Sequence, residues 1–334
     1  MSAPGISVII CCFNSAKKLP DTLKCLAHQK FLGGVSWEII LVNNASSDNT
    51  VEVALNEWKE YPVSVPFRIV EQPLPGLSFA REKGIAESSY DILVFCDDDN
   101  HLSENYLSLA FDLMTKNPEI SMLGGRVDGK LEDNNFDPRI KPLLPSLAIG
   151  AQSKTTGFID KPIFGAGMVL RRKSYNGLMS KGFKSLLSDR KGRYLSSGGD
   201  TELCIALLVC KYRIYYDERL KLEHFMPSGR LDINYINKLW SGGIVSSSIL
   251  MLYDYFMKVK ENRTYRMAYL NMILSYCKDI GYFFPRIFIG KNKFYSVFNL
   301  KHSVKRLVFV IGSYSLLKEY YQKVNHFYSS CERV

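Results

Sequence analysis

Ile92-Leu93-Val94-Phe95-Cys96-Asp97-Asp98-Asp99 is an apolar run that ends in three consecutive carboxylates. The run predicts a buried strand, and three carboxylates at its end repel one another unless a cation or a ligand offsets their charge. Oxygen ligands favour Mg²⁺ or Mn²⁺, which bind through one or two carboxylates and the phosphates of a substrate. The triplet therefore predicts a divalent-metal site with a phosphorylated partner. The alternative is that the aspartates solvate the strand end and cap a helix that starts near Ser103.

Strand and helix patterns alternate on both sides of this stretch. Apolar runs predict strands, and amphipathic spacing after each of them predicts helices. The predicted strands cover residues 6–12, 37–42, 67–70 and 92–96, and the helices follow near residues 17–27, 51–58, 79–86 and 106–114. This alternation predicts an α/β fold of Rossmann-like type, with a mostly parallel sheet covered by helices on both faces.

In such a sheet, ligands bind beyond the carboxyl ends of the strands. Polar residues that end the first and second predicted strands, at 11–14 and 43–44, should meet the aspartates there, where a nucleotide would lie. No GxGxxG follows the first strand, which argues against a dinucleotide enzyme, and no GxxxxGK[ST] supports a P-loop phosphotransferase.

Four ordered motifs resemble a known family. They are Ser7-Val8-Ile9-Ile10-Cys11-Cys12-Phe13-Asn14, Leu41-Val42-Asn43-Asn44-Ala45-Ser46-Ser47-Asp48-Asn49-Thr50, Pro75-Gly76-Leu77-Ser78-Phe79-Ala80-Arg81 and Asp97-Asp98-Asp99. Together they are similar to the inverting family 2 glycosyltransferases of GT-A fold, with a DXD-type aspartate motif. The resemblance runs from about residue 6 to about residue 227, roughly two-thirds of the chain.

The resemblance implies a nucleotide-sugar donor, most often a UDP-sugar, and a Mn²⁺ or Mg²⁺ cofactor. It implies that Asp97 contacts the ribose and that Asp99 binds the metal, with Asp97 close enough to share in it. The donor-binding residues expected from the motifs are Cys11, Phe13, Asn14, Asn43, Arg81, Asp97 and Asp98. Many members carry Asp where this chain has Asn43, whose neutral amide can both accept and donate.

Ser197-Gly198-Gly199-Asp200-Thr201-Glu202 predicts a glycine turn entering a helix. From the residues alone, Asp200 is an ordinary helix cap; the resemblance implies instead that it is the general base. It would take a proton from an acceptor hydroxyl while that oxygen attacks the anomeric carbon in line, with inversion. The family usually has Glu where this chain has Gly199, and Glu202 is the candidate substitute, although it should point to another side of the helix.

Two further segments carry expectations. His224 lies between apolar residues and is either a hydrogen-bonded structural residue or, by the resemblance, a third metal ligand. Gly165, Ala166 and Gly167 are either a tight turn or part of the sugar and acceptor pocket. Residues 128–158 show little periodicity and several prolines, which predicts a long loop beside the acceptor.

Composition indicates two units. The 334 residues, 46% of them apolar, suffice for a full core, and we expect a catalytic domain at 1–225, with a donor half at about 1–127 and an acceptor half at about 128–225, followed by a helical region at 226–334. Residues 1–225 carry 27 Lys/Arg and 27 Asp/Glu, whereas 226–334 carry 16 and 6, a net charge of +10. Half of the chain's aromatic residues also lie in this last third.

A basic, aromatic region suits an anionic membrane surface or a nucleic acid. Since 307–317, its longest uncharged apolar stretch, is too short to span a bilayer, we expect it to lie on a membrane, and we expect no nucleic-acid partner. The alternatives are that its aromatics pack on the catalytic domain or in a homodimer.

The cysteines and the amino terminus bear on the compartment. Cys11, Cys12, Cys96, Cys204 and Cys210 lie in apolar patterns without a CxxC pair, which predicts buried thiols in a reducing compartment. Met1 to Gly5 lack the charge and apolar core of a signal peptide. We therefore expect a cytoplasmic protein that associates peripherally with the inner face of the cell membrane.

The sequence as a whole favours a metal-dependent inverting glycosyltransferase that moves a sugar to a glycan or polyprenyl-linked acceptor in surface polysaccharide or glycolipid synthesis. The alternative is a non-catalytic homologue that binds a nucleotide sugar or a glycan, which Gly199 permits. A nucleotidyltransferase is less favoured, because no glycine- and lysine-rich loop follows the first strand.

Overall fold

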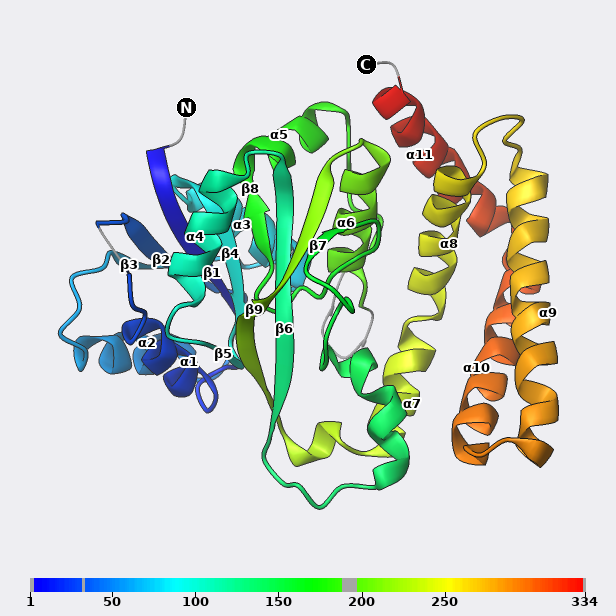
Figure 1. The fold of residues 1–334 in the computed structure, drawn as a ribbon, viewed down its shortest axis with the longest axis horizontal. Coiled ribbons are helices and arrows are strands. Elements are labelled where there is room, and N and C mark those ends of the chain that lie inside the picture. The colour runs from blue at the N-terminus through cyan, green and yellow to red at the C-terminus, as the bar shows by residue number, and fades with distance from the viewer. Residues whose placement is uncertain (1–2, 32–33, 188–196, 333–334) are drawn as a thin grey trace.

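The amino-terminal half alternates strands and helices, as the apolar pattern predicts (Figure 1). The computed structural model describes residues 3–31, 34–187 and 197–332, so Met1 and Ser2 lie outside it. The elements of this half are β1 (Ala3–Cys12), α1 (Leu19–Ala27), β2 (Trp37–Asn43), α2 (Thr50–Lys59), β3 (Phe67–Glu71), α3 (Leu77–Glu87), β4 (Tyr90–Asp97), β5 (Asn100–Leu102) and α4 (Tyr106–Lys116). Each strand and helix predicted here is confirmed, with small differences at the ends.

The central sheet has the strand order β3-β2-β1-β4-β8-β6-β9-β5, with β7 beside β9. The elements that complete it and flank it are β6 (Ile120–Leu131), β7 (Gly157–Ile159), β8 (Val169–Arg171), α5 (Arg172–Ser180), α6 (Gly199–Val209) and β9 (Arg213–Met226). The first four strands of the order are parallel. β8 is antiparallel to both of its neighbours, whereas β6 and β9 are parallel. The predicted α/β fold is confirmed, and its parallel character belongs to the first half.

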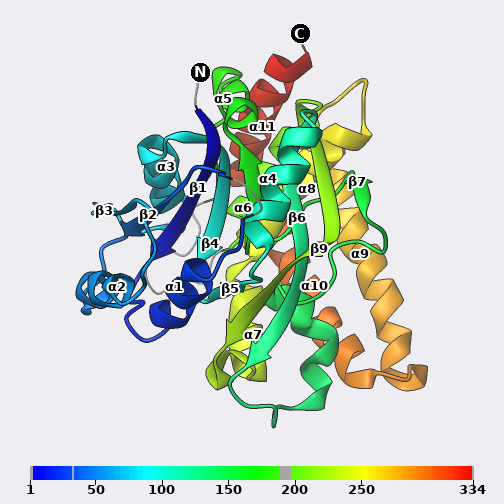
Figure 2. The ribbon, with the colours of Figure 1, turned by 60° about the vertical axis from the view of Figure 1, so that its left-hand side comes forward.

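Helices cover both faces of the sheet (Figure 2). Side chains alternate along β1, so Ile6, Val8 and Ile10 pack with α1, α2 and α4, whereas Ile9 packs with α3 and α6 on the other face. Because both faces are apolar, the ligand-binding polar groups are confined to the strand ends. In β1 and β4 these ends lie side by side, with Cys11 opposite Asp97.

The segment 128–158 is more ordered than the expected loop. β6 continues to Leu131, and a 3₁₀ helix, η1 (Pro138–Leu147), and β7 follow. Pro142 and Pro145 lie inside η1. Proline lacks the N–H that an α-helix needs in its interior, so the sequence showed no helical periodicity here although a tighter helix forms.

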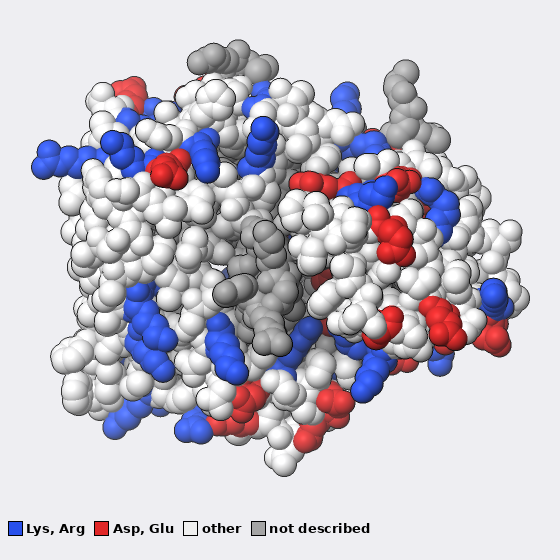
Figure 3. Space-filling view, turned by 180° about the vertical axis from the view of Figure 1, so that it is seen from behind, with Lys and Arg blue, Asp and Glu red and all other residues white. Residues whose placement is uncertain are grey.

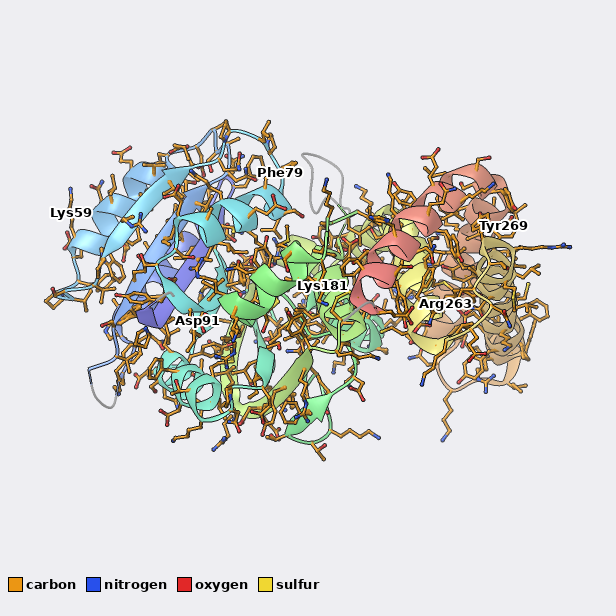
Figure 4. The ribbon with its side chains drawn as sticks, turned by 90° about the horizontal axis from the view of Figure 1, so that it is seen from above. Lys59, Phe79, Asp91, Lys181, Arg263 and Tyr269 are labelled. Atoms are coloured by element: carbon orange, nitrogen blue, oxygen red, sulfur yellow. A yellow bond between two sulfur atoms is a disulfide. The ribbon has the colours of Figure 1, made fainter. Side chains whose placement is uncertain are left out.

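The carboxyl-terminal third is helical. It consists of η2 (Ser228–Arg230), α7 (Ile233–Gly242), α8 (Ile244–Lys258), α9 (Tyr265–Ile289), α10 (Lys293–Gly312) and α11 (Tyr314–Glu332). α8 and α11 pack against α5 and α6 through Leu178, Cys204, Phe256 and Phe327, in one continuous core. α9 and α10 form an antiparallel hairpin at the far end of the molecule (Figure 1). Seen from above in Figure 4, Lys59 and Tyr269 lie at opposite ends and Lys181 lies between them.

Phe327 of α11 packs on the preceding part of the chain, where its ring lies 5.4 Å from that of Phe183 between centroids, which confirms that alternative for this residue. Other aromatics of this third pack among themselves. Tyr253, Phe256, Tyr321 and Tyr328 are buried, and the Phe256 ring lies 5.1 Å from Tyr321 and 5.3 Å from Tyr328 between centroids. None of the helices in the described ranges has both the length and the apolar content needed to cross a bilayer.

The prediction that Cys210 is a free thiol is wrong. It forms a disulfide with Cys331, which joins the end of α6 to α11. Beside it, the Ser330 hydroxyl donates to the Lys181 carbonyl at 2.5 Å. Because the two cysteines are 121 positions apart in the sequence, their spacing carried no sign of the pairing. Cys12, Cys96 and Cys204 are free and buried, as expected, and Cys11 is free and half-buried.

Candidate functional site

A cavity of about 510 Å³ opens where the carboxyl ends of β1 and β4 meet the start of α6. One side is formed by β1, β4 and α3, and the other by α6, η1 and α7. Of the residues that the sequence singled out, it is lined by Cys11, Phe13, Arg81, Asp97, Asp98, Asp99, Gly165, Ala166, Asp200 and His224. The structure thus brings the motifs of both halves of the chain to one site.

The side of the cavity formed by β1, β4 and α3 presents an exposed aromatic ring and a cation. Phe13 follows β1 with 51% of its side chain exposed, so its face is open to a planar ligand. Arg81, on α3, lies with its guanidinium carbon 5.7 Å from the centre of the Phe95 ring. Burial raises the pKa of the Cys11 thiol to about 12, so this residue contributes a neutral, polarisable surface.

Asp98 ties the aspartate triplet to the start of α1. Its carboxylate accepts hydrogen bonds from the Ser15 hydroxyl and from Lys18 Nζ, the latter at 2.8 Å, and its carbonyl accepts from Thr22 Oγ1 at 3.0 Å. Burial, with the adjacent charge of Asp99, raises the pKa of Asp98. These contacts give Asp98 a positioning task that its sequence motif did not assign.

Asp99 is the focus of a cluster of cations. It is 2% exposed, and its oxygens lie 3.2 Å from Arg230 Nη1, 3.4 Å from Lys18 Nζ and 3.4 Å from His224 Nε2. Burial alone would raise the pKa of Asp99, but the hydrogen bond and charge of His224, with the charges of Lys18 and Arg230, hold that pKa well below its usual range. The carboxylate is therefore ionised and already partly neutralised.

Asp99 and His224 are the pair of side chains that could share a metal ion here. Asp99 Oδ1 and His224 Nε2 are 3.4 Å apart, and His224 Nδ1 is buried with no hydrogen-bond partner among the described residues. Within residues 3–31, 34–187 and 197–332, no group of three His, Cys, Asp or Glu side chains is close enough to hold an ion. The pair fits an ion that takes its other ligands from substrate phosphates and water, as Mg²⁺ commonly does.

Asp200 lies in the first turn of α6, at the junction of the two halves. Its Oδ2 accepts from the Gly165 N–H at 2.7 Å, and its Oδ1 accepts from the Thr201 N–H at 2.8 Å. The N-cap of α6 is Gly198, so the expectation that Asp200 is an ordinary helix cap is wrong; Asp200 accepts these hydrogen bonds from within the first turn, and it also lines the cavity. A Cβ added to Gly165 would lie 2.7 Å from Arg81 Nη2 and 2.9 Å from Asp200 Oδ2. Gly165 therefore lets the two halves approach each other at the site.

Two of the expected donor residues do not line the cavity. Asn14 bridges to the loop after β2, where its Oδ1 accepts from the Ser47 N–H at 2.8 Å. Asn43 donates its Nδ2 to Glu71 Oε2 at 2.9 Å. The next residue, Asn44, does line the cavity, and its Oδ1 accepts from the Gly76 N–H at 2.8 Å, which fixes the turn before α3.

Gly167 and Glu202 also lie away from the cavity. Gly167 has φ of +70° and its carbonyl accepts from the Tyr106 hydroxyl; a Cβ there would lie 2.2 Å from Leu222. Glu202 is fully buried, and its carboxylate accepts from Ser185 Oγ at 2.7 Å and Tyr253 OH at 3.0 Å. It does point to another side of α6 from Asp200, as its spacing predicts.

The sequence motifs missed the residues that reach the cavity from elsewhere. These are Lys18, Arg230 and an apolar end formed by Pro145, Leu147 and Leu239. Arg230 belongs to η2, 131 positions from Asp99, and no motif surrounds it. The only sequence sign of the apolar end was the irregular, proline-rich character of 128–158.

The chain matches one protein-family model and is similar to several curated proteins. Residues 7–178 match the family model described as glycosyl transferase family 2. The chain is similar to a cholesterol galactosyltransferase of Borreliella burgdorferi, with 31% identity over 107 residues, which is 32% of this chain and 28% of that protein. It is also similar to a poly-beta-1,6-N-acetyl-D-glucosamine synthase of Staphylococcus epidermidis, with 27% identity over 122 residues, 36% of this chain and 28% of that protein. The matched region thus spans less than a third of these curated relatives.

Among solved structures, the fold is similar to that of S. aureus TarS 1–349. The likeness has a TM-score of 0.51 at 13% identity and covers 98% of this chain and 90% of that chain. For the same protein in complex with UDP-GlcNAc the TM-score is 0.53 at 13% identity, again over 98% and 90%. At this identity the likeness concerns the fold, and it extends over the carboxyl-terminal helices as well as the sheet.

Proposed function

The chain belongs to glycosyltransferase family 2, and from that premise we propose that it transfers a sugar from a nucleotide-diphosphate donor to a hydroxyl group of a glycan or lipid-linked acceptor. The observation that carries the proposal is the single cavity that joins Phe13, Arg81 and the aspartate triplet to Asp200. Its size suits one nucleotide sugar together with the end of an acceptor. A UDP-sugar is the proposed donor, because TarS, which shares the fold, has been crystallised with UDP-GlcNAc.

In this proposal the donor lies along the ends of β1 and β4. The base stacks on the exposed ring of Phe13, and the ribose hydroxyls donate to Asp97. The diphosphate then lies near Asp99, where Lys18 and Arg230 are already held by ion pairs. These cations can bond the diphosphate without moving far, so its negative charge is balanced both in the bound donor and in the departing product.

Asp99 and His224 are the residues that would hold Mn²⁺ or Mg²⁺, with the remaining ligands coming from the diphosphate and water. The ion, when bound, supplies further positive charge for the departing diphosphate. Asp97 lines the same end of the cavity and could bond the ion through water.

Asp200 acts as the general base. Each of its oxygens accepts one backbone N–H, and a carboxylate oxygen has a second lone pair. That lone pair can take the proton of the acceptor hydroxyl while the oxygen attacks the anomeric carbon from the side opposite the diphosphate. A single displacement of this kind inverts the anomeric configuration. The Gly165 N–H holds the carboxylate in place, a contact that does not depend on an acidic residue at Gly199.

The acceptor enters from the apolar end of the cavity. Pro145, Leu147 and Leu239 suit the apolar part of a lipid-linked acceptor or the ring face of a sugar. This supports a role in surface polysaccharide or glycolipid synthesis. The proposal includes the domain division expected from the sequence. A catalytic unit covers about 1–225, its acceptor half begins near 128, and a helical region follows it.

The test is a donor panel with the full chain. UDP-sugars are incubated with Mn²⁺, and release of UDP is measured for wild type, Asp200→Asn and Asp99→Ala. Asp200→Asn should lower kcat by about 10²–10⁴-fold while thermal shift still detects donor binding. Asp99→Ala should weaken donor binding as well as turnover.

Asp112→Asn is the matched control. Asp112 is an exposed carboxylate of α4 that pairs with Lys116, and its loss should change neither quantity. Full UDP release by Asp200→Asn would refute the assigned base. Donor binding without any turnover by wild type, across the panel and with added acceptors, would favour the non-catalytic homologue.

A further inference from the structure

The hairpin of α9 and α10 carries apolar stripes that no other part of the described chain covers. On α9 one set of exposed uncharged positions repeats at intervals of three and four residues, as Met267, Leu270, Leu274, Cys277, Gly281, Phe284 and Phe288. On α10 the exposed apolar positions are Val297, Val304, Val308 and Ile311. We call these two sets the outer stripes. Side chains at such spacing share one face of a helix.

Other faces of the same helices pack against the protein. On α9, Ala268, Met272 and Tyr276 are buried, and on α10, Phe298 and Val310 are buried. The outer stripes therefore do not serve the fold of the hairpin, because its core is already provided. At the tip of the hairpin the exposure is greatest, with Phe288 66% and Ile289 84% exposed. An apolar surface of this extent marks an interaction site.

Beyond Asp279 of α9, the charge around the stripes is positive. From Ile280 to Lys318 the chain has seven Lys/Arg residues and no Asp or Glu. Lys291 and Lys293 are exposed at the tip beside Phe288 and Ile289, and Lys301 is exposed on α10 between Val297 and Val304. In Figure 3, acidic side chains gather over the catalytic half, whereas the end that holds these helices is mostly white and blue.

The tip is also connected to the acceptor end of the cavity. Phe298 packs in one apolar cluster with Leu147 and Leu239, both of which line the cavity. At the rim of the same cluster, the guanidinium carbon of Arg139 lies 5.0 Å from the centre of the Phe294 ring. The hairpin tip and the apolar end of the cavity are thus neighbours across one packed layer.

We infer that the outer stripes and the tip of the α9–α10 hairpin dock on an anionic lipid bilayer. The apolar side chains enter the boundary between headgroups and acyl chains, and the lysines bond the anionic headgroups. A second copy of the chain fits this face less well, because two such faces would place lysines of like charge together. The docking does not depend on the proposed transfer reaction, although it would bring the acceptor end of the cavity towards lipid-linked molecules.

The test is co-sedimentation of the full chain with vesicles. Vesicles of phosphatidylcholine alone are compared with vesicles that also contain phosphatidylglycerol. Wild type should bind the anionic vesicles and bind the neutral ones far less. Two variants change the docking face: one combines Phe284→Gln, Phe288→Gln and Ile289→Gln, and the other combines Lys291→Glu, Lys293→Glu and Lys301→Glu.

The lysine variant should lower the partition coefficient on anionic vesicles by about a hundredfold or more, since each of the three basic residues near the surface contributes about fivefold. The apolar variant should lower it by roughly tenfold or more. Matched controls change exposed residues of the catalytic domain. The control for the apolar variant combines Leu55→Gln and Leu74→Gln, and the control for the lysine variant combines Lys59→Glu, Lys173→Glu and Lys184→Glu. These controls should bind as wild type does.

A second measurement does not depend on pelleting. Phe288→Trp should show a blue shift of its fluorescence on adding anionic vesicles, whereas Leu74→Trp should not. Donor-induced thermal shift, retained in every variant, separates a loss of docking from a damaged donor site. The absence of wild-type binding to anionic vesicles would overturn the inference. So would a solution dimer that the apolar variant converts to monomer, since the face would then be covered by a second copy.

Discussion

Glu202 of α6 accepts hydrogen bonds from the segment 185–187 and from Tyr253 of α8. Its removal should weaken the packing of this segment and of α8 against α6. Besides Ser185 and Tyr253, the Leu187 N–H donates to its Oε2 at 3.0 Å and the Leu186 N–H to the same oxygen at 3.0 Å. Replacing the fully buried Glu202 by alanine leaves these donors without their acceptor, and two of them, on Leu187 and Tyr253, are themselves closed to water. The free energy of unfolding should fall.

The magnitude follows from the number of donors left unpaired. Leu187 and Tyr253 are buried, and each unsatisfied buried donor costs about 1–3 kcal/mol, so Glu202→Ala should lose about 2–6 kcal/mol. For a chain of 334 residues the unfolding entropy makes this a fall of about 3–8 °C in Tm. Glu202→Gln should cost far less, because its amide oxygen can accept from both backbone N–H groups while its NH₂ donates to the Tyr253 oxygen.

The pH dependence has a defined sign. Burial raises the pKa of the Glu202 carboxyl above its ordinary 4.5, and its hydrogen-bond donors only partly offset this. A raised pKa in the folded state means that the associated stability is present below pH 4.5 and is lost as pH rises through the folded value. The stability of wild type relative to Glu202→Gln should therefore decrease over that window.

Thermal unfolding of a double-mutant cycle measures these quantities. Tyr253→Phe should cost about 1 kcal/mol in wild type. In Glu202→Ala it should instead recover about 1–3 kcal/mol, since it removes a buried hydroxyl that has lost its acceptor. Glu223→Gln, on the exposed side of β9, should leave Tm unchanged. An unchanged Tm for Glu202→Ala would refute the anchoring role. A loss in Glu202→Gln as large as in Glu202→Ala would show that the charge, rather than the acceptor geometry, is required.

Two further outcomes are expected. Gly165→Ala should lower turnover by about tenfold or more, through displacement of Asp200, because the new Cβ would lie 2.9 Å from its Oδ2; normal turnover with an unchanged Tm would contradict the close approach. Cys331→Ser should lower the stability of the oxidised protein by about 2–5 kcal/mol. A reductant should lower the Tm of wild type and leave the Tm of this variant unchanged. Equal sensitivity of both proteins to the reductant would contradict the disulfide with Cys210.

The local pattern of the sequence was enough for the first half of the fold. Near-continuous apolar runs, each followed by an amphipathic stretch, predict β1 to β4 and their helices, because these elements depend on neighbouring residues. The aspartate triplet directly follows the apolar run of β4. The rule that ligands bind at the carboxyl ends of strands then predicts a site beside it. Asp200 could be located because a glycine turn precedes it.

Residues whose contacts are distant in sequence could not be predicted in the same way. The partners of Asp99 include Arg230, which a separate element brings to the site. Asn43 resembles a donor-binding residue in its motif, but Glu71 on the neighbouring strand takes its amide hydrogens. η1 was missed because its prolines obscure helical periodicity, although it supplies one wall of the cavity.

The apolar cluster that contains Leu147, Leu239 and Phe298 has a consequence for altering the proposed acceptor site. Leu147 and Leu239 line the cavity and also belong to the buried apolar cluster that contains Phe298, so their size is constrained from both sides. Substitutions there would reshape the acceptor end while leaving the donor end, at β1 and β4, untouched. Phe298 offers an indirect route, because a smaller ring would let both leucines relax away from the cavity. In the proposed function, acceptor preference could thus be changed by substitutions in the carboxyl-terminal helices. Removing those helices would change the shape of the cavity that they help to form.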